Sequence, residues 1–316
     1  MCVERFVRIS ESPLLTPADY NWPIGHDTIM FPCVVDVGDK IASPLTRYYL
    51  YLAAHGGKGI VLALADEPTG PWRMHRDNPV YPLEMAVECR GHISSPDVIW
   101  VPEKRKFHLY YHGPNSSNGK GQHTGMAISR DGLNFVPWKV NPIILNGPEG
   151  SWTSAMAAYL RVFRIGGRFY GIYMGHRGEK IGKVPISCQL LAWSEEGLNW
   201  RTDPETVILA PDPAAGDFGR IRHVGVLACE DMVWIFYSTY DSPLLDREVI
   251  RVARVAFGPE GPGRLERLGT CLVPNGGWEG RELRDPFPLL VDDRLYLYYI
   301  GGGEKGLGLA VADWPL

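Results

Sequence analysis

The stretches Ser129-Arg-Asp-Gly-Leu-Asn-Phe135 and Ser194-Glu-Glu-Gly-Leu-Asn-Trp200 decide the fold of this chain. They share the Ser, Gly, Leu, Asn and final aromatic positions, and they lie 65 residues apart. Each follows a short apolar run, and each leads into a segment that ends in Ile-Leu. Self-similarity at a fixed period is the signature of a repeat architecture, so further copies are expected along the chain.

Three further copies follow the same period. The stretch 65–72 ends in Trp72, and a looser copy at 256–265 ends in Leu265. The last copy, at 6–15, resembles 135–144, but it stands at the N-terminus with no strands before it. The marks of the five copies are Phe6, Trp72, Phe135, Trp200 and Leu265, at spacings of 66, 63, 65 and 65. Units of this length account for the whole chain of 316 residues.

Each unit also contains a strand of alternating aromatic residues, at 48–54, 107–113, 169–175, 233–239 and 295–301. Alternation is typical of β-strands, and the 36 Gly and 26 Pro residues between the apolar runs supply turns. The pattern predicts an all-β fold, a single five-bladed β-propeller of four-stranded antiparallel blades over residues 1–316. A β-sandwich is the alternative, but it explains neither five matched units nor the displaced first strand.

The blades are expected at about 17–84, 85–148, 149–212, 213–280, and 281–316 plus 3–16. In this arrangement the N-terminal strand completes the last blade, so that the propeller closes without an exposed strand edge.

The composition argues against several other classes of protein. A net charge of −4 gives no general attraction to nucleic acid or anionic membranes, and no apolar run approaches the ~20 residues of a transmembrane helix. The six Cys show no metal-binding spacing, which is typical of buried thiols in a reducing compartment. The N-terminal sequence MCVERFVRIS is charged where a signal peptide is apolar, so a cytoplasmic location is expected.

A ring of polar residues is predicted at the centre, where the innermost strand of each blade lines a channel. Counting back ten residues from the aromatic strands gives Asp97, Tyr159, His223 and Asp285. Aligning GHDTIMFP with SSPDVIWVP adds Asp27 in the first unit. Buried carboxylates are costly without partners, so three Asp with a His and a Tyr predict a functional pocket. The structural alternative is that single Asp residues cap turns or tie strands together.

Further side chains are expected to bind a substrate at this pocket. Basic residues adjoin the ring in sequence and would hold carboxylates ionised or bind hydroxyl groups: His26, Arg90, His92, Arg222, Arg281 and Arg284. Trp152 and Tyr159 are candidates for stacking on a sugar, although packing between blades accounts for Trp152 equally well, and His176 is a candidate contact at the rim. No His/Asp/Glu triad has metal-site spacing, so no cofactor is predicted, and a structural Ca²⁺ in the channel stays open.

Four local motifs occur in blade order: Thr69-Gly-Pro-Trp72, Ser-Pro-Asp97-Val, Ser129-x-Asp131-Gly132 and Arg284-Asp285-Pro286. Together they resemble the five-bladed propeller glycosidases, which include arabinanases, xylosidases, fructan hydrolases and anhydro-galactosidase-like enzymes. As architecture, the resemblance covers nearly the whole chain.

The resemblance implies Asp27 as base or nucleophile, and Asp97 as the residue that orients it or tunes the pKa of the acid. The third-blade Glu that usually serves as the acid is replaced here by Tyr159, with Glu149 ten residues upstream. His223, Glu282 and Asp285 are therefore the candidate acids.

The sequence thus predicts a glycoside hydrolase that cleaves a mono- or oligosaccharide by carboxylate acid/base chemistry. Two alternatives stay open. The arginines could instead bind inorganic phosphate in a glycoside phosphorylase, and the missing third-blade Glu would suit a non-catalytic carbohydrate-binding propeller. Neither nucleic acid nor a membrane is expected as a partner.

Overall fold

The chain folds into antiparallel β-sheets in the computed structural model, which describes residues 5–21, 27–116, 121–258 and 260–316. These residues contain no α-helix, which confirms the predicted all-β class. Within them the helical elements are short 3₁₀ turns at Pro17–Asp19, Leu83–Met85, Pro102–Lys104, Pro213–Ala215 and Gly277–Glu279. None of these helices is long and apolar enough to cross a membrane.

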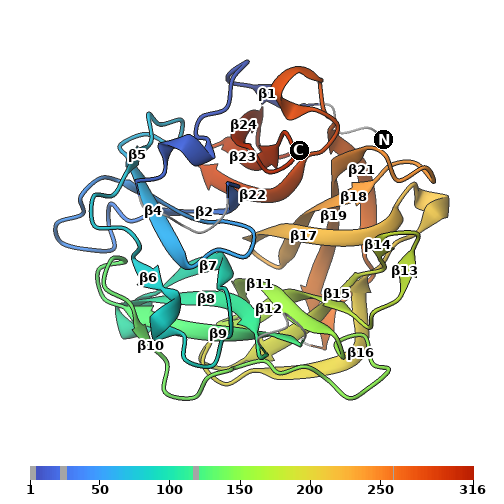
Figure 1. Cartoon of the computed structure of the whole chain (residues 1–316), viewed down its shortest axis with the longest axis horizontal. Helices are drawn as coiled ribbons and strands as arrows, with labels where there is room; N and C mark the ends of the chain where they lie inside the picture. The colour runs from blue at the N-terminus through green and yellow to red at the C-terminus, as the bar shows by residue number, and fades with distance from the viewer. Residues whose placement is uncertain (1–4, 22–26, 117–120, 259) are drawn as a thin grey trace.

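The strands form successive groups along the chain (Figure 1). The first group contains β2 (Met30–Asp36), β3 (Tyr48–Ala53), β4 (Gly59–Ala65), β5 (Arg73–Met74) and β6 (Tyr81–Pro82). The second contains β7 (Ser94–Val101), β8 (Lys106–Pro114), β9 (Gln122–Ser129) and β10 (Val136–Pro137). The third contains β11 (Met156–Ile165), β12 (Arg168–His176), β15 (Cys188–Ser194) and β16 (Arg201–Leu209), with a ribbon of β13 (Lys180–Ile181) and β14 (Val184–Pro185).

The fourth group contains β17 (Phe218–Cys229), β18 (Met232–Tyr240), β19 (Glu248–Gly258), β20 (Gly261–Pro262) and β21 (Glu266–Leu272). The last contains β22 (Arg284–Val291), β23 (Arg294–Gly301), β24 (Gly306–Asp313) and, from the other end of the chain, β1 (Val7–Arg8). Val7 pairs with Val311 in antiparallel register, which confirms the predicted pairing of the N-terminal strand with the C-terminal sheet.

The first strands of the groups lie toward the centre of the molecule (Figure 1). Their contacts run from β2 to β7, β11, β17 and β22, and return from β22 to β2. The second and third groups are joined in one sheet by a single parallel pair, Met156 with Gln122. Two groups depart from the predicted four strands, because β5 and β6 share β4, and β20 and β21 share β19. Pro79 lies between β5 and β6 and has no N–H to donate, so it interrupts pairing there.

The repeated aromatic marks hold neighbouring groups together. Phe135 packs against Tyr51 at 6.0 Å between ring centroids, and Trp200 packs in the same way against Tyr110 at 5.8 Å. The hydroxyl groups of these tyrosines donate to the carbonyls of Gly132 and Gly197, at 2.7 and 2.8 Å. These two glycines have φ of 73° and 70° within the repeated Ser-x-x-Gly turn, a conformation that favours glycine. The repeated turn, with its aromatic residue and its glycine, therefore packs each of these groups against the preceding group.

Five of the six clusters of buried apolar residues each lie between two consecutive groups, and the small sixth cluster lies within the third group. One cluster joins the ends of the chain, because Tyr298 and Leu309 of the last group pack with Leu50 and Val61 of the first. These five clusters thus fill the spaces between the sheets, and polar side chains meet aromatic rings at the centre.

Candidate functional site

The innermost strands share an irregularity near their starting ends, and we call this end of the five strands the mouth. Two residues of β2, between the paired positions Met30 and Cys33, face a single residue of β3, and equivalent bulges occur in β7, β11, β17 and β22. Four residues in these bulges have positive φ: Phe31 (60°), Ser95 (51°), Tyr159 (58°) and Asp285 (49°). Bulges redirect side chains, and backbone strain of this kind gathers at functional sites.

A buried contact between His223 and Asp285 lies at the mouth. His223 Nδ1 meets Asp285 Oδ1, and the other carboxyl oxygen accepts a hydrogen bond from the Phe31 N–H at 3.1 Å. Burial lowers the pKa of His223 well below its ordinary value and raises the pKa of Asp285. Both shifts favour the uncharged forms of the two side chains.

Aromatic rings surround this pair. Phe31 stacks on Tyr159 at 5.5 Å, and His223 meets Tyr159 edge to face at 4.6 Å. On the far side of Tyr159, His112 lies 4.5 Å away and shares a 2.6 Å hydrogen bond with Ser95. Phe31, His112 and His223 are buried, and Tyr159 is the partly exposed aromatic ring next to these titratable groups.

Arg284 connects three glutamates at the mouth. Its guanidinium lies 2.7 Å from a carboxylate oxygen of each of Glu248, Glu282 and Glu304. The side chain of Glu282 is 33% exposed, whereas those of Glu304 and Glu248 are 10% and 0% exposed. The Arg284 guanidinium thus holds together three carboxylates that differ in their exposure to solvent.

Two further arginines and a histidine join this group. Arg220 donates to Glu248 at 3.1 Å, Arg222 lies 3.6 Å from Glu304, and His55 lies 3.1 Å from the other oxygen of Glu304. Burial acts to raise the pKa of Glu304, but His55 and the two nearby guanidinium groups outweigh it and leave the pKa below its ordinary value. Glu304 is accordingly ionised at neutral pH.

Asp97 lies deeper than the mouth and makes a different contact. It forms a buried ion pair with Arg161 at 3.2 Å and accepts a hydrogen bond from the Val162 N–H at 2.8 Å. Arg161 also donates to the carbonyls of Pro32, Pro96 and Val224, at 3.5, 2.7 and 3.1 Å. Its guanidinium lies 5.5 Å from the Phe287 ring, so Arg161 of β11 contacts all four other innermost strands. Asp97 and Arg161 therefore close the centre below the mouth.

Asp27 lies at the rim. Its side chain is 83% exposed and pairs with Lys305 at 2.6 Å. Lys305 follows Glu304 directly, so Asp27 adjoins the glutamate group without entering it. His26 lies outside the described residues.

The remaining predicted residues are spread more widely. His92 packs on His112 at 5.6 Å and thus belongs to the mouth. Arg90 is exposed and donates to the Val87 carbonyl, and Arg281 pairs with Asp246. Trp152 packs under Arg177 at 4.0 Å, and His176 accepts from the Gly178 N–H at 3.2 Å. These contacts draw Arg281, Trp152 and His176 toward neighbouring loops and not toward His223.

The predicted alignment of the ring is correct at three positions and wrong at two. Tyr159, His223 and Asp285 meet as expected. Ser95 takes the place predicted for Asp97, because the turn between β7 and β8 has four residues while that between β22 and β23 has two. Phe31 takes the place predicted for Asp27, which precedes β2 altogether. The signal that locates this position is the following proline, in Phe31-Pro32, Ser95-Pro96 and Asp285-Pro286.

Sequence reasoning missed Glu248, Glu304 and Arg220, which stand in no repeated motif. Among the described residues, no group of three or more His, Cys, Asp or Glu is arranged to hold a metal ion. The expectation about cofactors stays a prediction.

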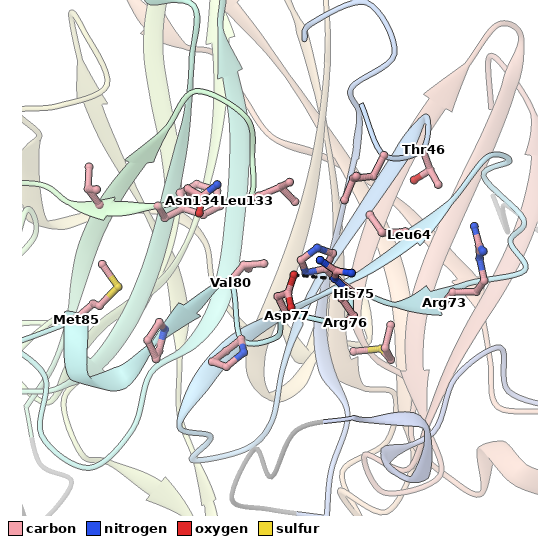
Figure 2. Close-up of a pocket in the computed structure, with 16 residues that line it drawn as sticks. Thr46, Leu64, Arg73, His75, Arg76, Asp77, Val80, Met85, Leu133 and Asn134 are labelled. Atoms are coloured by element: carbon pink, nitrogen blue, oxygen red, sulfur yellow. Dashed lines mark hydrogen bonds and ion pairs between the residues drawn. The ribbon is translucent and has the colours of Figure 1, made fainter. Parts of the chain in front are cut away.

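Cavities are also present away from the mouth. One of about 870 Å³ lies between the outer strands of the first two groups, lined by residues such as Arg73, His75, Val80 and Leu133 (Figure 2). All of its lining residues come from these two groups, so it is distinct from the cluster around Arg284.

Comparison with known proteins places this architecture in a class. No family model matches the chain. An uncharacterized protein of Acanthamoeba polyphaga mimivirus is 22% identical over 346 residues, covering 95% of this chain and 88% of that protein. A putative glycosidase from Bacteroides thetaiotaomicron has a similar structure with a TM-score of 0.70 and 15% identity, covering 98% of this chain and 97% of that chain.

A β-1,2-mannobiose phosphorylase from Listeria innocua, in complex with β-1,2-mannobiose, is also similar. Its TM-score is 0.66 at 13% identity, with 98% of this chain and 96% of that chain covered. The fold is therefore that of the propeller-like glycoside hydrolases and phosphorylases, as the sequence motifs indicated. At these sequence identities the likeness shows the fold alone, and the function depends on the residues at the mouth.

Proposed function

We propose that the chain is a five-bladed β-propeller, one domain over residues 1–316, and a glycoside hydrolase with its active site at the mouth. The circuit of contacts among the innermost strands and the five core clusters between groups support five blades. The predicted blade boundaries belong to this proposal.

The catalytic assignment rests on two neighbouring environments at the mouth, one that favours uncharged side chains and one that favours an ionised carboxylate. The His223–Asp285 contact favours a protonated, uncharged pair, and Glu304 is held ionised by Arg222, Arg284 and His55. Glycoside hydrolysis needs one group to protonate the leaving oxygen and a carboxylate to activate water or attack the anomeric carbon. Groups whose pKa values are pushed apart identify the acid and the base.

We assign His223 as the acid, with Asp285 as its positioning residue. The Nε2 proton passes to the glycosidic oxygen while the proton on Asp285 moves to Nδ1, so the pair ends as a neutral imidazole beside a carboxylate. Nε2 is buried and has no hydrogen-bond partner among the described residues, so it is available to a substrate. Glu304 acts as base or nucleophile, and the Tyr159 ring, packed on Phe31, stacks on the sugar.

Charge balance favours hydrolysis over phosphorolysis. The three arginines at the mouth face three glutamates, so the described group has no surplus positive charge for a phosphate dianion. A glycoside phosphorylase is the second candidate, because a similar structure is a phosphorylase and because the 3.6 Å pair of Arg222 with Glu304 is long.

The test is turnover on a panel of aryl glycosides and disaccharides, with and without inorganic phosphate. Glu304→Gln and His223→Gln should each lower kcat/KM by about 10²–10⁴-fold, and Glu282→Gln, on the same guanidinium, by less than about tenfold. Full activity in Glu304→Gln would remove the assignment. Release of a sugar phosphate would replace hydrolysis by phosphorolysis, and binding without turnover across the panel would indicate a carbohydrate-binding protein.

A further inference from the structure

Two cavities between the first and second groups share the same walls. The first is the cavity of about 870 Å³ in Figure 2, and the second has a volume of about 560 Å³. One wall is the loop after β2, where 40–43 line the smaller cavity and 45–46 line the larger. The other wall follows β9, where 130–131 line the smaller cavity and 133–136 the larger. Because residues close in sequence line both, the two cavities lie next to each other between the same two groups, and together we call them the tandem groove.

The tandem groove is basic, although the whole chain carries a net charge of −4. Its lining includes six Lys or Arg residues and two acidic residues, Asp77 and Asp131. Asp131 is engaged by its own turn, where it accepts hydrogen bonds from Leu133 N–H and Ser129 Oγ, at 2.9 and 2.7 Å. Lys40, Arg76 and Lys104 pair with carboxylates. The other three cations, Arg73, Arg105 and Arg130, form no ion pair within the described part of the chain. The groove therefore has cationic groups left for an anionic ligand.

The floor of the groove is apolar. Trp100 is partly buried and packs on Phe107 at 4.8 Å between centroids. Farther along, Met74, Val80 and Phe135 line the larger cavity. An apolar floor beneath separated cations matches a chain of pyranose rings, whose C–H faces pack on apolar side chains while substituents reach the rim.

We propose that the tandem groove binds an acidic oligosaccharide, a chain of sugars that carries carboxylate or sulfate groups. The saccharide class rests on the proposed function, whereas the negative charge follows from the groove alone. The smaller cavity includes Lys104 and Arg105, in the turn that follows the far end of β7, while the mouth lies at the start of that strand. The groove is therefore a second binding site, separate from the site of cleavage.

Calorimetric titration at about 50 mM salt tests the proposal, because salt screens such contacts. The probes are oligogalacturonate for carboxylates, a heparin-derived oligosaccharide for sulfates, and maltohexaose as the neutral counterpart. Binding of one or both acidic probes, but not of maltohexaose, is expected. Reversing two charges in Arg105→Glu/Arg130→Glu should weaken binding by at least about tenfold, while Arg264→Glu, an exposed arginine on the fourth group, should leave it unchanged.

Three results would overturn the proposal: no binding of either acidic probe, equal binding of maltohexaose, or tighter binding of a single-stranded oligonucleotide of equal charge. Thermal unfolding of each variant shows that the fold is retained. Glu304→Gln should bind the acidic probe as the wild type does, so a failure of the hydrolase assignment and a failure of the groove proposal are separable.

Discussion

Arg161, which is buried, and Arg284, which is largely buried, lie on innermost strands and face carboxylates, yet their surroundings differ. Arg161 has one carboxylate and three backbone carbonyls, and each of its guanidinium nitrogens has a partner. Around Arg284, by contrast, buried Glu248 Oε1, Arg220 Nε and His223 Nε2 have no hydrogen-bond partner in the described residues. Buried polar groups are normally satisfied, so the unsatisfied cluster is the one that suits a ligand.

The two clusters also differ in redundancy. The Asp97–Arg161 pair holds single opposite charges, so loss of either leaves the other buried and uncompensated. Arg284 has three glutamates, and loss of one leaves two. We therefore expect substitutions at the first cluster to affect stability and substitutions at the second to affect function.

The largest stability effect is expected for Asp97→Asn. It removes the charge that faces Arg161, and breaking a buried pair in this way costs about 3–5 kcal/mol. Urea unfolding measures the change, and Glu282→Gln, whose parent carboxylate is partly exposed, should cost less than about 1 kcal/mol. An Asp97→Asn variant as stable as the wild type would show that the two clusters do not differ in the way described.

The sequence predicted the fold well, because the residues that repeat along the chain are those that form the turns and pack neighbouring groups together. The turn motif, the aromatic strands and the displaced N-terminal strand all appear where they were expected. The structure also bears out the meeting of Tyr159, His223 and Asp285, since their strands have two-residue turns of equal length.

Other parts of the site were out of reach of sequence reasoning. Asp97 was displaced by a longer turn, and the equivalence of Asp27 and Asp97 depended on a loop whose length differs from that of the other units. Glu248 and Glu304 come from a strand start and a turn, 36 and 20 residues from Arg284, and nothing in their local sequence marks them. Only tertiary contacts bring them to Arg284.

A smaller loss of stability is expected when the pH is lowered. It arises from the buried histidines of the mouth and not from the Asp97–Arg161 pair. Burial lowers the pKa of His112 well below its ordinary value, and the neighbouring His92 and His223 act in the same direction. The folded protein therefore binds fewer protons than the unfolded chain below the unfolded pKa of about 6.5, and acid favours unfolding. Stability should fall from about pH 6.5 downward by up to about 1.4 kcal/mol per pH unit for this histidine.

His112→Gln provides the matched measurement, because glutamine can still bond to Ser95 but does not titrate in this range. Urea unfolding at pH 7.0, 6.0 and 5.0 should show a shallower loss of stability in the variant than in the wild type. Parallel curves would mean that His112 gains its proton equally in both states, and that the burial described here does not control its ionisation.

The smallest effect on stability and activity is expected for Asp27→Asn, because Asp27 lies at the rim, outside both arginine clusters. The Asp27–Lys305 pair is exposed, and such pairs contribute about 0.5 kcal/mol or less. If catalysis depends on the cluster around Arg284, the variant should keep kcat/KM within about twofold of the wild type, because among the described residues the Asp27 side chain pairs with Lys305 and not with Glu304 itself. A loss comparable to that of Glu304→Gln would instead make Asp27 the base, as its resemblance to the first-blade Asp implies. In that case a substrate would have to draw the exposed carboxylate away from Lys305 and into the mouth, and Lys305→Ala would then leave activity intact or raise it.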